Sequence, residues 1–430
     1  MRIAFKTFGC RANSTDTDAL YLEARRRGYE VVADDEIADA YVINTCTVTE
    51  NADRDARQQA FRFKRQNSRA LVAMVGCYAQ VAVEALLRIS EIDFIVGTAD
   101  KFKILDYFSG TFSGLNIERN QVHEPAGFLP ERFPGSRQAR ATIKVQDGCN
   151  CRCSFCIIPM ARGKSRSLPL KTVVEQVADA YAQGFNEVVL TGIHLAHYGW
   201  DRNTDLLTLL RTLLAGNEGP RIRLSSLDPF EIDAIIDMLG REERLCPHLH
   251  IALQSGSNKI LGRMRRLQRA GEFIDITNKI AKTCPDAFIG VDVIAGFPGE
   301  GEVEFAETIQ CLKGSYWARL HVFSFSSRGG TEAAMLGDQV PSNAIFARSK
   351  MLRNMSEARY HYFLDSQIGR KKQVLLEKPS KQHPGMWLGH TENYLPTLSL
   401  VDFGVTKQVI ASLIQTRKGD RVCTRPLKVD

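Results

Sequence analysis

The sequence predicts an α/β protein with an N-terminal open parallel α/β sheet, a central partial (βα)6 barrel and a C-terminal small β-barrel. Three observations predict it. Short apolar strand patterns alternate with helical patterns in two long stretches, a stretch rich in proline and glycine separates them, and the last 66 residues switch to short β-rich pieces. A chain of 430 residues with 44% apolar content can bury more than one core, so two or three domains are expected.

The first segment, residues 1–118, contains four short strand-like runs. A helix between the first two is predicted to begin at a Ser14 cap and to end at Gly28. Strands that alternate with helices indicate an open parallel sheet. Residues 119–138 hold three prolines and two glycines, and we interpret them as a linker. The predicted strands are Arg2–Lys6, Ala40–Asn44, Leu71–Val75 and Phe94–Val96.

The second segment, residues 139–364, contains six strand candidates separated by helical patterns, for example Lys171–Gln183. Six such units are too few for a closed eight-stranded barrel, but they suit a partial one, whose chemistry would lie at the carboxyl ends of the strands. The candidates are Ala141–Val145, Glu187–Thr191, Ile222–Ser225, His250–Leu253, Ile289–Ile294 and Leu320–Phe325.

The third segment, residues 365–430, is predicted to form a small barrel of the oligonucleotide-binding sort. It carries 11 Lys/Arg against 6 Asp/Glu, which is +5 of the total formal charge of +7. A basic module suits a polyanionic partner, although a solvated charged face is the default interpretation. The strand-like pieces are Gln373–Leu376, Tyr394–Val401, Gln408–Leu413 and Asp420–Thr424.

Composition and cysteine usage exclude several classes of protein. The N-terminus has no targeting pattern, and no apolar run approaches the ~20 residues of a bilayer span, so a cytoplasmic protein without a membrane partner is expected. The cysteine count is 11, which is odd, and no secretion signal accompanies it. A disulfide framework is therefore not expected, and the thiols are either core residues or ligands.

Three cysteines, Cys149, Cys153 and Cys156, form a Cys-x3-Cys-x2-Cys pattern directly after the first predicted barrel strand. Three thiolates on one loop can bind three irons of a [4Fe–4S] cube and leave the fourth iron open. A closed tetrahedral zinc site needs a fourth ligand. Cys151 offers one, so zinc remains an alternative.

Another three cysteines, Cys10, Cys46 and Cys77, each follow a predicted strand of the first segment by a few residues. The carboxyl ends of parallel strands converge on one edge of a sheet, where such folds bind ligands. The three thiols are therefore predicted to meet in space. The alternative is three buried core cysteines.

The spacing of the first cysteine pattern, with the aromatic Phe155 before its third cysteine, resembles the radical S-adenosylmethionine superfamily. The resemblance implies that the open iron holds the amino and carboxyl groups of S-adenosylmethionine. One electron from the cluster then cleaves the sulfonium and produces a 5′-deoxyadenosyl radical. In such enzymes the cofactor carries the difficult chemistry and the protein orients it.

Nearly the whole chain resembles the methylthiotransferase family. The resemblance implies a methylthiotransferase domain, a radical S-adenosylmethionine domain and a C-terminal RNA-binding TRAM-like domain over the three segments. It also implies a second [4Fe–4S] cluster on Cys10, Cys46 and Cys77 that takes part in sulfur delivery, a low-potential electron donor of the flavodoxin or ferredoxin type, and a sulfur donor. No acid–base catalytic residue is assigned. The matching runs are Thr7–Asn13, Val42–Thr49, Val75–Gln80 and Gln146–Ser167.

Loops that follow the predicted barrel strands supply candidate contacts to S-adenosylmethionine. We select Ser225, Ser226 and Gln254 because small and polar residues permit close approach and hydrogen bonds to a ligand. Phe155 is selected because the resemblance rests in part on an aromatic before the third cysteine. Ordinary turn chemistry is the alternative for each loop.

The substrate is inferred from the resemblance. Family members modify either an adenosine beside the tRNA anticodon or an aspartate of a ribosomal protein. The TRAM-like motif Gly389–Tyr394 and the basic tail favour RNA, and the anticodon loop presents unstacked bases. Ile157–Ser167 and Leu190–His194 resemble enzymes that act on N6-threonylcarbamoyladenosine at tRNA position 37. N6-isopentenyladenosine at the same position and the ribosomal aspartate remain alternatives.

Asp228 departs from the family pattern, in which glutamate is usual, and Cys151 is an extra thiol in the cluster loop. Two other hypotheses stay open. One is a different radical S-adenosylmethionine reaction, with the first-segment cluster used for electron relay. The other is an RNA-binding protein with structural zinc sites. The cysteines without ligand spacing are expected to be structural, namely Cys246, Cys284, Cys311 and Cys423.

Overall fold

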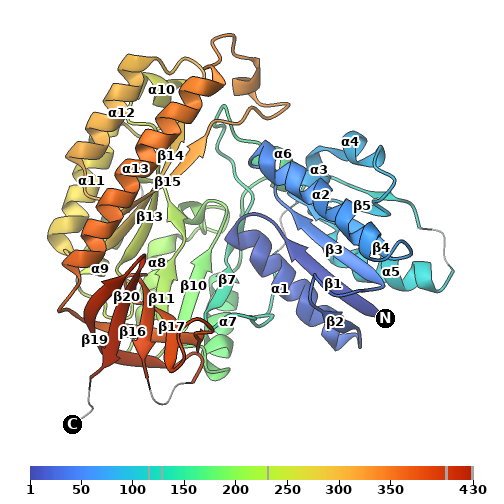
Figure 1. Cartoon of the computed structure of the whole chain (residues 1–430), viewed down its shortest axis with the longest axis horizontal. Helices are drawn as coiled ribbons and strands as arrows, with labels where there is room; N and C mark the ends of the chain where they lie inside the picture. Colours follow the sequence, from blue (N-terminus) through green and yellow to red (C-terminus); the bar gives the residue numbers. More distant parts are fainter. Residues whose placement is uncertain (115–116, 127–128, 230–231, 402–404, 428–430) are drawn as a thin grey trace.

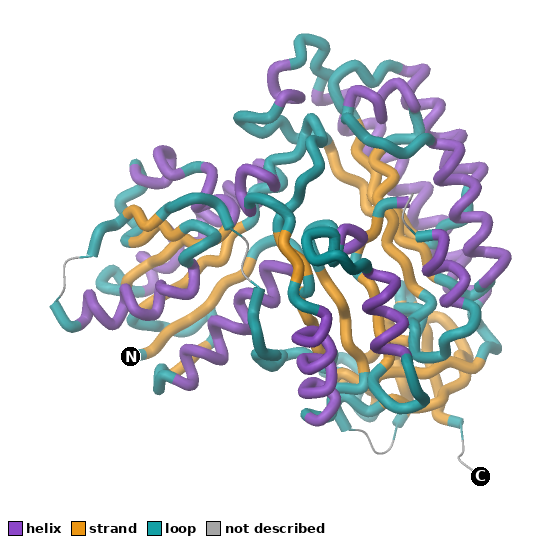
Figure 2. Tube along the Cα trace, turned by 180° about the vertical axis from the view of Figure 1, so that it is seen from behind, coloured by secondary structure: helices purple, strands orange, loops and turns teal. Residues whose placement is uncertain are grey.

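The computed structural model describes residues 1–114, 117–126, 129–229, 232–401 and 405–427. Two residues of the predicted linker, 127–128, thus lie outside the described part. Figures 1 and 2 show an N-terminal α/β unit beside a larger central unit, with the C-terminal strands packed at one end of the central strands.

The N-terminal unit is a parallel sheet of six strands in the order β2-β1-β3-β4-β5-β6. The four predicted strands are present within one residue of their expected bounds, which confirms the open parallel sheet. The two edge strands were not predicted, because they are only three and two residues long. The strands are β1 Arg2–Thr7, β2 Glu30–Val32, β3 Ala40–Thr45, β4 Leu71–Gly76, β5 Phe94–Val96 and β6 Asn120–Gln121.

Helices cover both faces of this sheet and bury one apolar cluster on each face. The first helix, α1, begins at Arg11 with Cys10 at its N-cap, so the predicted Ser14 cap is wrong. Ser14 lies inside the first turn, and its hydroxyl reaches back to the Cys10 carbonyl oxygen at 3.4 Å. Gly28 follows the helix at φ +83°, as expected. The helices are α1 Arg11–Arg26, α2 Glu50–Gln66, α3 Cys77–Val81, α4 Val83–Leu87 and α5 Ile104–Phe112.

The central unit contains the six predicted strands. They form two parallel sheets, β11-β10-β7 and β12-β13-β14-β15, and β11 and β12 are consecutive pieces separated by Ser225 alone. The predicted partial barrel is therefore confirmed. The strands are β7 Ala141–Lys144, β10 Glu187–Thr191, β11 Arg221–Leu224, β12 Ser226–Leu227, β13 His248–Gln254, β14 Phe288–Ala295 and β15 Arg319–Ser324.

Helices pack on the outside of these strands and enclose the largest apolar cluster of the chain. A short antiparallel pair, β8 Gln146–Asp147 and β9 Arg166–Ser167, closes the base of the loop that carries Cys149, Cys153 and Cys156. The helices are α6 Ile158–Arg162, α7 Leu170–Ala182, α8 Leu206–Leu214, α9 Asp233–Leu239, α10 Asn258–Arg263, α11 Ala270–Thr283, α12 Glu302–Gly314 and α13 Ser342–Ser366.

The C-terminal strands form a closed barrel in the order β16-β17-β18-β20-β19, which confirms the small β-barrel. It packs against the amino-terminal ends of the central strands: Arg221 and Arg223 at the start of β11 donate to backbone carbonyl oxygens of this barrel. None of the described helices is both long and apolar enough to cross a membrane. The barrel strands are β16 Lys371–Pro379, β17 Met386–Thr391, β18 Pro396–Leu400, β19 Val409–Lys418 and β20 Arg421–Pro426.

Candidate active site between two cysteine trios

The first trio lies at the carboxyl edge of the N-terminal sheet. Cys10 caps α1 after β1, Cys46 follows β3, and Cys77 begins α3 after β4. Gly9, at φ +106°, passes so close that a Cβ there would lie 2.5 Å from the Cys46 Cβ. Burial, together with the nearby Cys10 and Cys77 thiols, raises the pKa of the Cys46 thiol to about 12. The structure thus brings the three predicted thiols close enough to one another to interact electrostatically.

A buried arginine accompanies this trio. The Arg162 side chain is fully buried, and its Nε donates to Cys77 Sγ at 3.3 Å. A guanidinium beside a thiol favours the thiolate, which is the form that ligates metals. Three free thiols with a cationic partner are therefore a donor set that fits an iron–sulfur cluster. Arg162 lies in a run that resembles the family, but nothing in the sequence indicates its contact with Cys77.

The second trio lies on the loop between β8 and α6. Gly148 is at φ +77°, and a Cβ there would lie 2.1 Å from the Lys164 carbonyl oxygen, so the loop needs glycine at its first turn. Burial raises the pKa of the Cys156 thiol to about 12, and the neighbouring Cys153 thiol contributes to the rise. Arg266 Nη1 lies 3.8 Å from Cys153 Sγ. This trio, like the first, combines free thiols with an arginine.

Cys151 lies between the second trio and a histidine pair. Its backbone N–H donates to Cys149 Sγ at 3.4 Å, and the ligand atoms of Cys151, His194 and His197 lie within 4.8 Å of one another. His194 Nε2 is 2.5 Å from Asp228 Oδ2, and Asp228 also pairs with Arg266. The aspartate that departs from the family pattern is thus held by two cationic or potentially cationic side chains.

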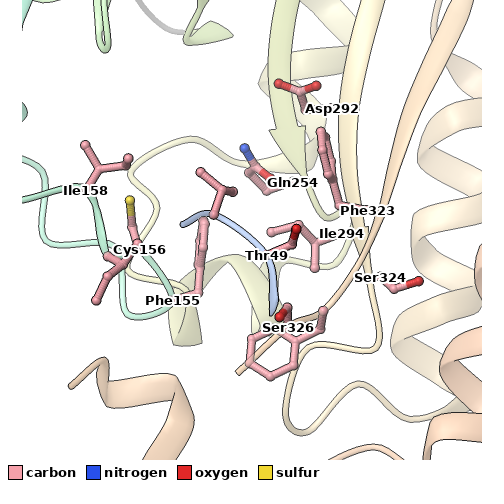
Figure 3. Close-up of a pocket in the computed structure, with 13 residues that line it drawn as sticks. Thr49, Phe155, Cys156, Ile158, Gln254, Asp292, Ile294, Phe323, Ser324 and Ser326 are labelled. Atoms are coloured by element: carbon pink, nitrogen blue, oxygen red, sulfur yellow. The ribbon is translucent and has the colours of Figure 1, made fainter. Parts of the chain in front are cut away.

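One cavity is lined by residues that follow Cys46 and by Cys156 with its neighbours (Figure 3). Of the predicted S-adenosylmethionine contacts, Phe155 and Gln254 line it, and Gln254 adopts φ +66°, a conformation that is uncommon for a residue with a side chain. Ser225 is buried at the break between β11 and β12, and Ser226 is exposed; neither lines the cavity. The lining residues are Val48, Thr49, Phe155, Cys156, Ile157, Ile158, Gln254, Asp292, Ile294, Phe323, Ser324, Phe325 and Ser326.

Several of these lining residues were not selected from the sequence. Val48 and Thr49 lie at the end of a run that resembles the family, and Asp292 has no motif around it. Nevertheless, Val48 and Thr49 follow Cys46 after one intervening residue, and Ile157 and Ile158 follow Cys156 directly. The segments that leave the two trios therefore face the same space.

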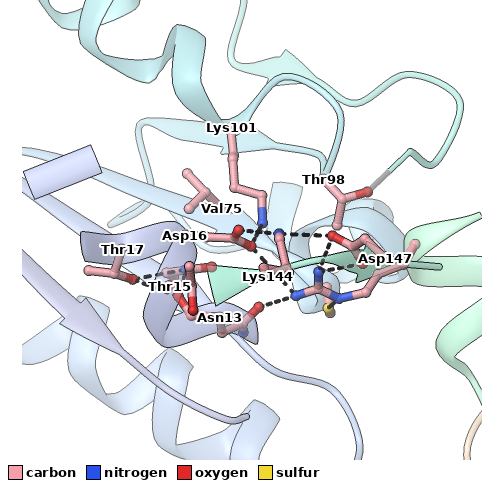
Figure 4. Close-up of polar contacts among 12 residues, drawn as sticks. Asn13, Thr15, Asp16, Thr17, Val75, Thr98, Lys101, Lys144 and Asp147 are labelled. Atoms are coloured by element: carbon pink, nitrogen blue, oxygen red, sulfur yellow. Dashed lines mark hydrogen bonds and ion pairs between the residues drawn. The ribbon is translucent and has the colours of Figure 1, made fainter. Parts of the chain in front are cut away.

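A buried network of charges holds the N-terminal unit against the central unit (Figure 4). Asp16 of α1 pairs with Lys101 and with Lys144 of β7. Asp147 pairs with Lys144 at 2.9 Å and with Arg162 at 2.9 Å. All five side chains have no solvent exposure. Because Arg162 also contacts Cys77, the network links the first trio to the base of the second.

Sequence comparison with known proteins identifies the family of this chain. It is 38% identical over 407 residues to the threonylcarbamoyladenosine tRNA methylthiotransferase MtaB of Aquifex aeolicus, covering 92% of this chain and 96% of that protein. The chain belongs to the radical S-adenosylmethionine methylthiotransferase family. The Bacillus subtilis protein of the same name is 36% identical, with 96% of this chain and 93% of that protein covered. The tRNA-2-methylthio-N(6)-dimethylallyladenosine synthase of Oceanobacillus iheyensis is 29% identical, with 96% and 81% covered.

Two family models match the chain, and a solved structure shares its fold. Residues 2–97 match the uncharacterized protein family UPF0004, and residues 143–312 match the radical SAM superfamily. The radical S-adenosylmethionine methyltransferase TsrM of Kitasatospora setae, solved with cobalamin and a [4Fe–4S] cluster bound, has a similar fold. Its TM-score is 0.57 at 15% identity, with 78% of this chain and 77% of that chain covered. This methylthiotransferase therefore has the fold of a radical S-adenosylmethionine enzyme with an α/β unit before the barrel.

Proposed function

We propose that this methylthiotransferase adds a methylthio group to carbon 2 of N6-threonylcarbamoyladenosine at position 37 of tRNA. The observation that carries the proposal is the shared cavity, whose walls come from the residues after Cys46 on one side and around Cys156 on the other. A sulfur group held at the first trio and a substrate activated at the second would meet there.

The proposed cofactors are two [4Fe–4S] clusters and S-adenosylmethionine. Cys10, Cys46 and Cys77 would hold one cluster, and Cys149, Cys153 and Cys156 the other. When bound, these groups supply the one-electron chemistry that an unpolarised C–H bond requires, which acid–base side chains cannot supply. Arg162 donates to Cys77 and Arg266 lies beside Cys153, so their positive charges would offset the negative charge of ligating thiolates. Phe155 and Gln254 line the space for S-adenosylmethionine, with Ser225 and Ser226 as further candidates.

The proposed partners follow from the same assignment. A tRNA anticodon loop presents adenosine 37 without the need to open a duplex, and the basic C-terminal barrel offers a surface for its phosphates. A flavodoxin or ferredoxin would supply the electron, a sulfur donor would renew the transferred sulfur, and the reaction would take place in the cytoplasm. We assign residues 1–118, 139–364 and 365–430 to the methylthiotransferase, radical and RNA-binding domains, with 119–138 as the linker.

Nucleoside analysis of tRNA tests this function. A strain that lacks the gene is expected to contain N6-threonylcarbamoyladenosine but none of its 2-methylthio derivative, and the intact gene is expected to restore it. Loss of the methylthio group from dimethylallyladenosine instead would favour the second named activity among the relatives. An unchanged content of both methylthio nucleosides would contradict the proposal.

A glycine pair tests the cluster on the first trio. In Gly9→Ala the new methyl group would overlap the Cys46 side chain, so we expect the reconstituted enzyme to lose about four irons per chain, the content of one cluster. Gly28→Ala is the matched control, because Gly28 also has a positive φ but nothing lies within 4 Å of its Cβ position. Its backbone strain is about 1–2 kcal/mol, and its iron content should not change. Equal iron in both variants would contradict the cluster assignment.

A further inference from the structure

A second pocket lies inside the partial barrel, on the side of the C-terminal strands. It is lined by side chains from all three units: Arg11 from α1, His250 and Arg319 from the central strands, and Tyr394 from the turn after β17. Arg319 and His321 are exposed, so the pocket is open to solvent. Neither the comparisons nor the sequence motifs assign a ligand to this pocket.

The strand register connects this pocket to the cavity between the trios. Gly290 pairs with Arg319, Asp292 with His321, and Ile294 with Phe323, so β14 and β15 present three successive rows to the inside of the barrel. The first row lines the second pocket and the third row lines the cavity; in the middle row, His321 lines the second pocket and Asp292 lines the cavity. Rows two residues apart on a strand are separated by ~7 Å. A purine in the cavity would therefore have its substituent within reach of the second pocket.

Positive charge dominates the pocket. Neither Arg11 nor Arg319 forms an ion pair with a carboxylate in the part of the chain that the structure describes; Arg11 Nη2 donates to the Tyr394 hydroxyl at 3.2 Å, and the Arg319 guanidinium lies 4.5 Å from the Tyr360 ring centroid. Two acidic groups border the pocket, and histidines engage both: His250 engages Asp292 at 2.7 Å, and His390 engages Glu377 at 3.0 Å. Gly290 lies in register between His250 and Arg319, and its missing side chain leaves room for a ligand.

Two histidines, His250 and His321, add hydrogen-bonding groups to the pocket. Partial desolvation of the ring, together with the charges of His250 and the two arginines, lowers the pKa of His321 to about 4, and Asp292 acts in the opposite direction. His321 is therefore neutral at pH 7 and offers a hydrogen bond rather than a charge. The ligand atoms of His250, Asp292 and His321 lie within 4.8 Å of one another, a spacing that also suits a metal ion. Two arginines without a carboxylate partner beside them oppose a cation and favour an anion.

We infer that this pocket binds the carboxylate of the threonyl group on the substrate adenosine, with Arg319 and Arg11 as its cationic contacts. The inference rests on the proposed function. It also gives a physical basis for choosing between the two substrates named among the relatives, since a threonylcarbamoyl group carries a carboxylate and a dimethylallyl group is apolar. If an apolar substituent entered the pocket, the two arginines would lose water without gaining an anionic partner.

Two anticodon stem-loop RNAs test the inference. They differ only in the threonyl group, which is the free acid in one and the neutral carboxamide in the other. We expect the reconstituted wild-type enzyme, with S-adenosylmethionine, to bind the acid about 10- to 100-fold more tightly at constant salt, as expected for hydrogen bonds to a charged group. In Arg319→Gln this preference should fall to a few-fold or less. Arg11 is a poorer test, because it follows Cys10.

Arg353→Gln is the matched control, since Arg353 is an exposed residue of α13, outside the pocket. It should keep the wild-type preference for the acid. Equal wild-type affinity for the two RNAs, or an undiminished preference in Arg319→Gln, would overturn the inference. Methylthio product from the acid RNA is measured in the same wild-type samples: its absence contradicts the proposed function, whereas product without a preference for the acid contradicts only the carboxylate pocket.

Discussion

Cys46→Ala and Cys153→Ala are both expected to abolish methylthio transfer, but each variant should lose a different iron–sulfur cluster. Each trio offers three thiols to its cluster, so removal of one ligand leaves two, too few to retain it. Each variant should therefore fall from about eight irons per chain to about four. Cys46→Ala should still cleave S-adenosylmethionine to 5′-deoxyadenosine, because the second trio is intact. Cys153→Ala should not.

The measurement combines iron and sulfide content with both products after anaerobic reconstitution. Cys423→Ala on β20 is the control, because it removes a free cysteine far from both trios in the sequence and should retain the full iron content. Zinc in place of iron at either trio would favour the RNA-binding alternative. Methylthio product from Cys46→Ala would show that the first trio serves another purpose.

The strands were predictable because their apolar runs are local. β4 is a continuous apolar segment, and β14 is apolar apart from Gly290 and Asp292; such segments stand out in a sequence. β17 was missed, since Trp387 and Leu388 are flanked by Gly385 and Gly389. There, burial against β16 and β18 decides the conformation, and that pairing is not local.

The ligand trios were predictable for a related reason: each thiol has a fixed place relative to a strand end or to its neighbours in one loop. The arginines beside them were not. Arg162 is one of 56 basic residues, and its role arises from contacts with Cys77 and Asp147, which lie on other elements. The Ser14 cap failed similarly. A polar first turn usually meets solvent, whereas here Asn13 and Asp16 enter a buried interface between units.

That interface gives the largest expected effect on stability. Burial raises the pKa of the Asp16 carboxyl, but Lys101, Lys144 and Arg162 outweigh it and hold the pKa below its usual value. Asp16 is therefore ionised at neutral pH and neutralises cations that have no solvent exposure. Asp16→Asn keeps the size of the side chain and removes its charge. We expect it to reduce the free energy of unfolding by about 3–5 kcal/mol, the usual cost of an uncompensated buried charge.

Asp18→Asn, two residues along α1, separates charge burial from a general effect on the helix. Asp18 pairs with Arg137 at 2.6 Å, but the Arg137 side chain is 42% exposed and can be solvated when its partner is lost. Asp18→Asn should therefore reduce the free energy of unfolding by no more than about 1 kcal/mol. Denaturant unfolding of both variants measures the difference. Similar losses in the two would mean that the buried network contributes no more than a surface pair. A large loss of unfolding free energy in Asp16→Asn alone would mean that charge neutralisation holds the two units together. The same network would then also hold Arg162 beside Cys77.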